Sequence, residues 1–184
     1  MNIYDFDGTI YSGDSTFDFY FYALGKKPSL VRFWPKQAVA FSLYALKKIS
    51  KTQMKERFYS FLTGIDAEAM LEDYWDTHEK NIFPYYRDQQ REDDIIISAS
   101  PEFLLKPICK RLGIQYLMAS RVDSKTGKYT GKNCWGPEKV IRLKDQMDID
   151  HCDKFFSDSH SDQPLADIAD EAFLIEKGKI VPWH

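Results

Sequence analysis

Two aspartates, Asp5 and Asp7, lie within three residues of each other at the end of an apolar run near the start of the chain. The run reads IYDFDGT, and its apolar residues are typical of a strand that enters a core. A buried carboxylate is costly unless it is paired or bound to a metal. The pair therefore indicates either a turn with surface acids or a catalytic site that holds a cation.

Other polar residues follow other apolar runs. Ser98 lies near the end of DIIISAS, Asp158 and Asp162 follow KFFS, and Lys139 lies near the start of the helical stretch GPEKVIRL. The carboxyl ends of parallel strands meet at one edge of a sheet, where ligands bind. Carboxylates gathered there repel one another unless a hard cation joins them, and oxygen ligands of this kind suit Mg²⁺. Ser98 and Lys139 can hold the negative oxygens of a phosphoryl group.

The surrounding pattern predicts an α/β fold with a doubly wound parallel sheet, because short apolar strands alternate with helices after residue 94. We expect residues 15–91 to be helical and to be inserted after the first strand, over one end of the sheet. Residues 1–13 and 92–184 would then form the core domain, and residues 14–91 a helical cap. The predicted strands cover residues 2–6, 94–100, 115–120, 154–159 and 171–181, with a β-hairpin at 122–131 and a helix at 163–170.

Composition and charge exclude several classes of protein. The net charge of −3 over 184 residues provides no basic footprint for nucleic acid. It also provides no polybasic anchor, so membrane contact through the aromatic and basic residues of the cap is possible but not favoured. Cys109, Cys134 and Cys152 are widely spaced and indicate reduced thiols rather than disulfides or a zinc site. The longest apolar stretch, 38–46, is much shorter than the roughly 20 residues that span a bilayer, and no signal peptide is evident. We expect a soluble, cytoplasmic protein with a small phosphorylated partner; its oligomeric state stays open.

Four motifs in order resemble those of the haloacid dehalogenase superfamily. They are DFDGT, the strand that ends near Ser98, the downstream Lys139 and SDSHSD, and together they span nearly the whole chain. The arrangement is most similar to the phosphoserine phosphatase-like branch (subfamily IB), in which a helical C1-type cap lies between the first two motifs. The resemblance implies a Rossmann-like core and a Mg²⁺-dependent phosphatase.

The resemblance also implies a role for each matching residue. Asp5 would be the nucleophile that forms an aspartyl-phosphate, and Asp7 the general acid and base. Ser98, Ala99 and Lys139 would bind the phosphoryl group. Thr9 would steady the loop and, together with Asp14, contribute to the substrate-binding site. The implied Mg²⁺ ligands are Asp5, Asp158 and the main-chain carbonyl of Asp7, with Asp162 supporting the metal's waters or orienting Lys139.

Two departures from the phosphoserine phosphatase pattern weaken the expectation of phosphoserine as substrate. Ala99 and Ser100 replace a pair of glycines, and Ser161 replaces an asparagine. A lipid phosphate, such as phosphatidylglycerophosphate, is an alternative substrate that members of a similar sub-branch use. A catalytically silent module that binds a phosphorylated ligand is a second alternative, although a mere binder gains nothing from crowded acids.

Several assignments have alternatives within the sequence. Lys128 or Lys132 could replace Lys139, and His160 fits an exposed loop better than a metal ligand. Basic residues cluster between residues 47 and 57, and this run is more typical of a solvated face than of a site for a substrate head group. If a cap cation does bind the substrate, Lys55 and Arg57 are the candidates. The many aromatic residues of the cap would form a small helical core, with some lining the pocket or forming an exposed patch.

Overall fold

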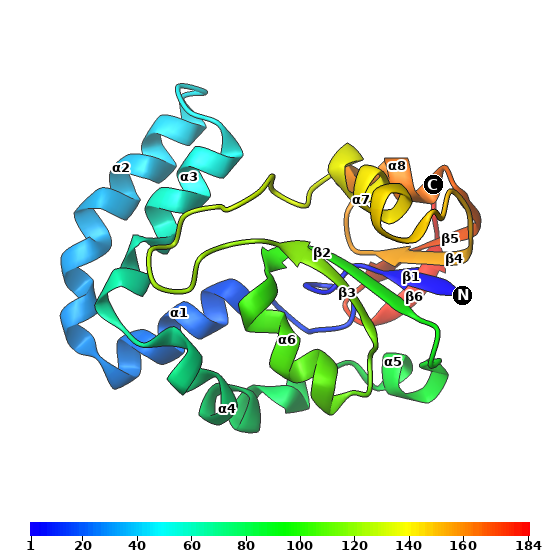
Figure 1. The fold of residues 1–184 in the computed structure, drawn as a ribbon, viewed down its shortest axis with the longest axis horizontal. Helices are drawn as coiled ribbons and strands as arrows, with labels where there is room; N and C mark the ends of the chain where they lie inside the picture. Colours follow the sequence, from blue (N-terminus) through cyan, green and yellow to red (C-terminus); the bar gives the residue numbers. More distant parts are fainter.

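The computed structural model describes all residues, 1–184, and its centre is a six-stranded sheet in the order β3-β2-β1-β4-β5-β6 (Figure 1). Neighbouring strands are parallel except β5 and β6, which are antiparallel. This strand order is that of doubly wound dinucleotide-binding folds. The predicted, mostly parallel α/β fold is therefore confirmed. The strands are β1 (Asn2–Tyr4), β2 (Ile95–Pro101), β3 (Tyr116–Ser120), β4 (Cys152–Ser157), β5 (Ala169–Glu176) and β6 (Lys179–Pro182).

Five helices lie between β1 and β2 in the chain, and three follow β2. Figure 1 places α1, α2 and α3 beyond one end of the sheet, and α7 and α8 together on one of its sides. The helices are α1 (Ser15–Lys26), α2 (Trp34–Ala45), α3 (Lys51–Phe58), α4 (Ala67–His78), α5 (Pro84–Gln89), α6 (Glu102–Arg111), α7 (Pro137–Met147) and α8 (Gln163–Ala166).

Strand β2 is apolar without alternation because both of its faces are covered. Ile95 and Ile97 belong to one buried cluster with Leu143 of α7, whereas Ile96 belongs to another with Leu105 of α6. Successive side chains of a strand point to opposite faces, so a sheet with helices on both sides needs apolar residues at every position. Helices on both faces leave the ends of the strands as the place where polar side chains can gather.

Helix α4 fixes the inserted helices to the sheet. The Trp75 ring lies edge-on to Phe6, with centroids 6.1 Å apart, and edge-on to Tyr11 at 5.7 Å. Trp75 Nε1 also donates a hydrogen bond of 2.8 Å to the main-chain oxygen of Leu104 in α6. One continuous apolar cluster thus joins α4 to the loop after β1, while α2 and α3 lie farther out (Figure 1).

Two predicted elements are wrong in extent. The predicted hairpin at 122–131 consists of a single antiparallel bridge between Val122 and Tyr129. Asp123 Oδ1 accepts hydrogen bonds from the following main-chain N–H groups, and Gly127 packs on the main chain of Tyr59, so the loop follows the cap instead of pairing as strands. The predicted helix at 163–170 ends at Ala166, because the chain enters β5 at residue 169.

The three cysteines are buried free thiols, as predicted. None of the helices combines the length and the apolar character that crossing a membrane requires.

Candidate active site

The ends of β1, β2 and β4 bring their polar residues to one crevice. The chain stays extended after β1, since the main-chain N–H of Asp5 donates to β4. Phe6 is fully buried in the core, and Asp5 and Asp7 on either side of it line a cavity of about 550 Å³. Alternate residues of an extended segment share a side, which explains the spacing of the two acids. Ser98 from β2 and Asp158 after β4 line the same cavity.

Lys139 lies in the first turn of α7 and joins two of the carboxylates. Its Nζ lies 2.9 Å from Asp5 Oδ1 and 2.7 Å from Asp162 Oδ2, and its side chain is 2% exposed. Burial alone would lower the pKa of Lys139, but the two carboxylates raise it above its usual value. The ammonium therefore stays charged and holds Asp5 at the floor of the cavity.

Asp7 has a different environment from Asp5. Its Oδ1 accepts a hydrogen bond of 2.7 Å from the Ser15 main-chain N–H, and its Oδ2 accepts one from the Ser100 hydroxyl. Burial, together with the charge of Asp14, raises the pKa of Asp7 to about 7. A carboxyl group with a pKa near neutrality can both give and take a proton, which general acid–base catalysis requires.

Gly8 lets the loop after β1 pass close to Asp158. A Cβ atom at Gly8 would lie 2.1 Å from Asp158 Oδ2, and the residue has a φ of +71°, which L side chains rarely adopt. Burial and the nearby charge of Asp5 raise the pKa of Asp158 to about 6. Gly8 thus allows the segment that carries Asp158 to approach the segment that carries Asp5 and Asp7.

The oxygen donors of the crevice fit Mg²⁺. Asp162 Oδ1 is buried without a hydrogen-bond partner, and burial raises the pKa of Asp5 in spite of Lys139. The Asp7 carboxylate accepts hydrogen bonds from Ser15 and Ser100, and the main-chain oxygen of Asp7 is the donor that the family resemblance assigns to the metal. No three acidic, His or Cys side chains form a ready-made ligand set. Few side-chain ligands are characteristic of Mg²⁺, which keeps several waters and shares substrate phosphates.

The helices inserted between β1 and β2 contribute cations and aromatic rings to the wall of the cavity. Lys55 Nζ donates 3.0 Å to the main-chain oxygen of Ala99, and burial and the nearby Lys51 lower the pKa of Lys55 to about 8. Lys51 Nζ lies 4.5 Å from the centroid of the Trp135 ring. Helix α3 turns one stripe of its surface inward, and the aromatic lining residues of the cap are Phe17, Phe41, Phe58 and Tyr59.

Comparison with known proteins decides the family. Residues 3–167 match the haloacid dehalogenase-like hydrolases. The chain belongs to this family. The family predicted from the four motifs is thereby confirmed.

Parts of the chain are similar in sequence to curated proteins. A probable phosphatase of Mycobacterium tuberculosis is 31% identical over 91 residues, which cover 45% of this chain and 31% of that protein. The protein CicA of Caulobacter vibrioides is 33% identical over 92 residues, which cover 46% of this chain and 41% of that one. The matches thus span less than half the length of these curated relatives.

Solved structures share the haloacid dehalogenase fold over almost the whole chain. A protein of unknown function from Bordetella pertussis Tohama I has a TM-score of 0.75 at 20% identity, over 94% of this chain and 87% of its own. A probable phosphoserine phosphatase from Vibrio cholerae has a TM-score of 0.64 at 14% identity, over 93% of this chain and 55% of its own. At these identities the likeness concerns the fold alone.

Two predicted substrate contacts of this haloacid dehalogenase-like chain lie outside the cavity. Thr9 is fully buried, and its main-chain oxygen accepts from the Tyr85 hydroxyl at 2.7 Å. Arg57 is on α3, but at 3.6 residues per turn the stripe that includes Lys51 and Lys55 leaves it to one side. Asp14 lines the cavity and also caps α1, since its Oδ1 accepts hydrogen bonds from the main-chain N–H groups of Thr16 and Phe17.

The alternatives to Lys139 lie outside the cavity, and His160 is an exposed residue, as predicted. Lys128 and Lys132 are exposed, and Lys132 pairs with Glu138 at 3.4 Å. His160 is exposed, and its ring contacts Trp183 with centroids 5.1 Å apart. These three side chains are absent from the cavity wall.

Sequence reasoning did not assign roles to several residues of the wall. Ser100 holds Asp7, and a signal existed, because Ser98 and Ser100 alternate along one segment. Ser157 Oγ donates 2.9 Å to Asp162 Oδ2, yet nothing in its surroundings in the sequence distinguishes it from other strand-end serines. Trp135 and Lys51 come from a loop and a helix that meet only in the folded chain.

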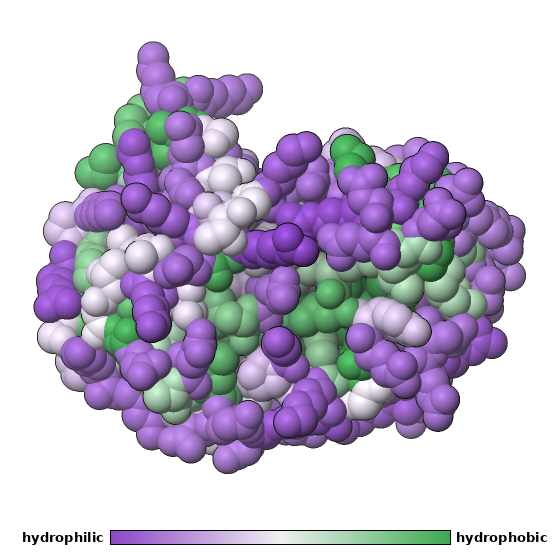
Figure 2. All heavy atoms as spheres, in the orientation of Figure 1, coloured by the Kyte–Doolittle hydropathy of each residue, from purple (hydrophilic) through white to green (hydrophobic).

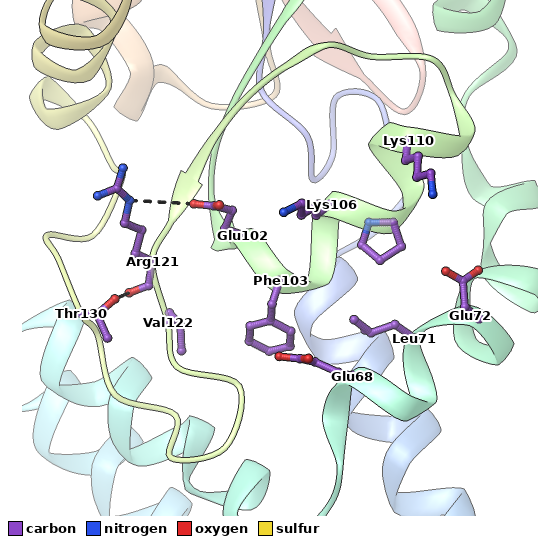
Figure 3. A pocket seen from close by; sticks show the side chains of 11 residues that line it. Glu68, Leu71, Glu72, Glu102, Phe103, Lys106, Lys110, Arg121, Val122 and Thr130 are labelled. Atoms are coloured by element: carbon purple, nitrogen blue, oxygen red, sulfur yellow. Dashed lines mark hydrogen bonds and ion pairs between the residues drawn. The ribbon is translucent and has the colours of Figure 1, made fainter.

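A second cavity, also of about 550 Å³, lies between α4, α6 and the loop at 121–130 (Figure 3). Figure 3 shows both acidic and basic side chains around its wall, with Arg121 paired to Glu102 at 4.0 Å. Glu68 accepts a hydrogen bond of 2.7 Å from the Ser124 hydroxyl. Because its charges are of both signs, this cavity lacks the concentration of carboxylates found at the strand ends.

Proposed function

We propose that the chain is a Mg²⁺-dependent phosphatase that hydrolyses phosphomonoesters through a phosphorylated Asp5. The observation that carries the proposal is that two carboxylates with different surroundings line the same cavity. Asp5 is held by the Lys139 ammonium at 2.9 Å, whereas Asp7 accepts only neutral donors and has a pKa near 7. The first suits a nucleophile and the second an acid–base group.

In the first half-reaction, a carboxylate oxygen of Asp5 attacks the phosphorus atom. The ester P–O bond breaks, and the leaving oxygen takes the proton of Asp7, so an alcohol departs. The ammonium of Lys139 and the hydroxyl of Ser98 stabilise the charge on the transferring phosphoryl oxygens. This requires Asp7 to be protonated at the start, which its raised pKa permits at neutral pH.

In the second half-reaction, Asp7 removes a proton from a water molecule that attacks phospho-Asp5. The bond between phosphorus and the Asp5 oxygen breaks, which releases inorganic phosphate and restores both acids. Asp5, Asp158 and the Asp7 carbonyl would hold Mg²⁺, with Asp162 supporting its waters. When bound, the ion neutralises the negative charge of the carboxylates and of the phosphoryl group.

The cavity wall favours a substrate whose leaving group is partly apolar. Phe17, Phe41 and Phe58 face the same space as the cations Lys51 and Lys55. Aromatic rings bury hydrocarbon surface, and cations bind phosphate or carboxylate groups. The combination supports an amphiphilic phosphomonoester, such as a lipid phosphate, as a second candidate beside a small metabolite such as phosphoserine.

The decisive experiment measures phosphate release with Mg²⁺ and with EDTA for the wild type, Asp5→Asn and Asp150→Asn. Asp150 is exposed and distant from the cavity, so its variant is the matched control. We expect Asp5→Asn to lose at least a thousandfold in kcat and to retain its far-UV circular dichroism. Activity in Asp5→Asn equal to that of the control would show that the nucleophile is misassigned. Silence of the wild type over a broad panel of phosphomonoesters would favour the binding module.

A further inference from the structure

Helix α2 has an apolar side that faces solvent. Only Gln37 and Ala40 of this helix are buried. At 3.6 residues per turn, the side opposite these two residues carries no charge. We call this side, together with the aromatic residues on one of its flanks, the α2 face; it consists of Ala38, Val39, Ser42 and Leu46, with Trp34 and Phe41 on the flank, and all six residues are exposed.

The exposure of this face is unusual for a water-facing helix, whose outer side is normally polar. Val39 is 54% exposed and Leu46 67%, and Trp34 is 52% exposed. Figure 2 shows apolar and weakly polar side chains among hydrophilic ones along the edge of the molecule where Figure 1 places α2. A contiguous apolar patch with a polar rim marks an interaction site.

The rim of the α2 face is strongly basic. Residues 19–55 contain eight Lys or Arg and no Asp or Glu, so the rest of the chain must carry −11 to bring the net charge to −3. Arg32 and Lys36 lie at the start of α2, and Lys47 and Lys48 follow its end. These four side chains are exposed, and none of them forms an ion pair with an acid. The cations are therefore available to an anionic partner.

We propose that the α2 face is a docking surface for an anionic lipid bilayer. A helix with an apolar side, Trp among its exposed residues and Lys or Arg beside it has the composition of helices that lie in the bilayer interface. Anionic headgroups would meet the basic ends of α2, and the apolar side chains would enter the boundary of the acyl chains. The unequal distribution of charge turns this basic end of the molecule, rather than the acidic remainder, toward the membrane.

A second copy of the chain is a poorer occupant of this face. A twofold dimer places the same surface against itself. Because both ends of α2 are basic, parallel and antiparallel pairing would each bring lysines and arginines together without acids to neutralise them. An anionic surface removes this repulsion, whereas a dimer through α2 increases it.

The α2 face adjoins the mouth of the catalytic cavity. Phe41 belongs to the face and also lines the cavity, where its ring centroid lies 6.4 Å from that of Phe17. When the protein is docked through the α2 face, the apolar edge of the cavity formed by Phe41 would lie next to the bilayer. The docking itself depends on surface residues alone and does not rest on the proposed phosphatase activity.

The test is flotation with vesicles of phosphatidylglycerol and phosphatidylcholine in equal parts, and with vesicles of phosphatidylcholine alone. The first variant combines Val39→Glu with Leu46→Glu, and its control combines Ile141→Glu with Ile180→Glu. All four residues are exposed aliphatic side chains, so both variants add two acids at sites of similar accessibility. We expect the wild type and the control to float with the anionic vesicles, and the α2 variant to bind at least tenfold more weakly.

A second pair of variants tests the charges. Replacing Lys47 and Lys48 by Gln should lower partitioning about fivefold for each lysine at low salt, whereas Lys125→Gln with Lys128→Gln should change it little. Asp5→Asn should bind vesicles like the wild type, which separates docking from catalysis.

Three results would overturn the proposal. They are a wild type that stays unbound with anionic vesicles, equal binding of the α2 variant and its control, and equal binding to neutral vesicles. Sedimentation that shows a dimer dissociated by the α2 variant, without vesicle binding, would assign the face to a second copy instead.

Discussion

Lys139 Nζ lies 2.9 Å from Asp5 Oδ1, although 134 positions separate the two residues in the chain. The same ammonium lies 2.7 Å from Asp162 Oδ2, so one cation serves a carboxylate after β1 and another after β4. Lys139 and Asp162 are each 2% exposed. Charges so deeply buried must satisfy one another, which makes the site sensitive to the loss of any one of them.

Removal of Lys139 should therefore destabilise the protein. In Lys139→Ala, two carboxylates lose their counter-charge, and we expect the free energy of unfolding to fall by about 3–5 kcal/mol in EDTA. Urea unfolding followed by circular dichroism measures the change. The control is Lys132→Ala, whose exposed pair with Glu138 should contribute no more than about 1 kcal/mol. Equal losses in the two variants would contradict the buried network.

Addition of Mg²⁺ should raise the melting temperature, and EDTA should reverse the effect. A ligand that binds only the folded state at a hundred times its Kd stabilises that state by about 2.7 kcal/mol. Asp158→Ala removes a proposed ligand and should abolish the shift, whereas Asp150→Ala on the surface should keep it. Differential scanning fluorimetry over a Mg²⁺ titration measures both. An undiminished shift in Asp158→Ala would place the metal elsewhere.

Substrate binding should weaken as the pH rises through about 8. Burial lowers the pKa of Lys55 to about 8, so this cation is charged below that pH and loses its charge above it. If Lys55 contacts an anionic group of the substrate, KM should rise several-fold between neutral pH and pH values above 8, with little change in kcat. Arginine keeps its charge, so KM of Lys55→Arg should lack this rise. A KM that rises identically in both proteins would exclude Lys55 as the titrating group.

Asp94 should contribute to a fall in stability as the pH rises toward neutrality, in addition to Asp7 and Asp158, whose raised pKa values act in the same direction. Burial raises the pKa of the Asp94 carboxyl from 3.8 to about 6, so the folded state binds the proton more tightly than the unfolded state between these values. The stabilisation is full below the unfolded pKa and is lost as the pH rises through the folded one. Asp94→Asn should have a flatter profile of unfolding free energy against pH, whereas exposed Asp88→Asn should follow the wild type. Parallel profiles for all three proteins would refute this assignment.

Local patterns in the sequence were enough to predict the parallel sheet. They were not enough to predict the loop at 122–131, whose conformation depends on packing. Alternating strands and helices predicted the parallel sheet because each strand needs apolar residues on two covered faces, as Ile95 and Ile96 show. The hairpin at 122–131 was wrong because Gly127 packs on the main chain of Tyr59, far away in the sequence. Turn residues alone could not distinguish these two outcomes.

The sequence by itself determined which residues stand at strand ends, since a carboxylate that interrupts an apolar strand is visible without coordinates. Asp5, Asp7, Asp158 and the resemblance to the family follow from that local signal. Ser98, expected at the end of its strand, is instead the fourth of the seven residues of β2. Only the tertiary structure decided how side chains meet across distant segments: Ser100 on Asp7, Lys51 on the Trp135 ring, and Thr9 and Arg57 away from the cavity. The physical reason is that the spacing of residues along the chain determines which side of a helix or strand each residue occupies. What that side contacts depends on how the helices and strands pack together.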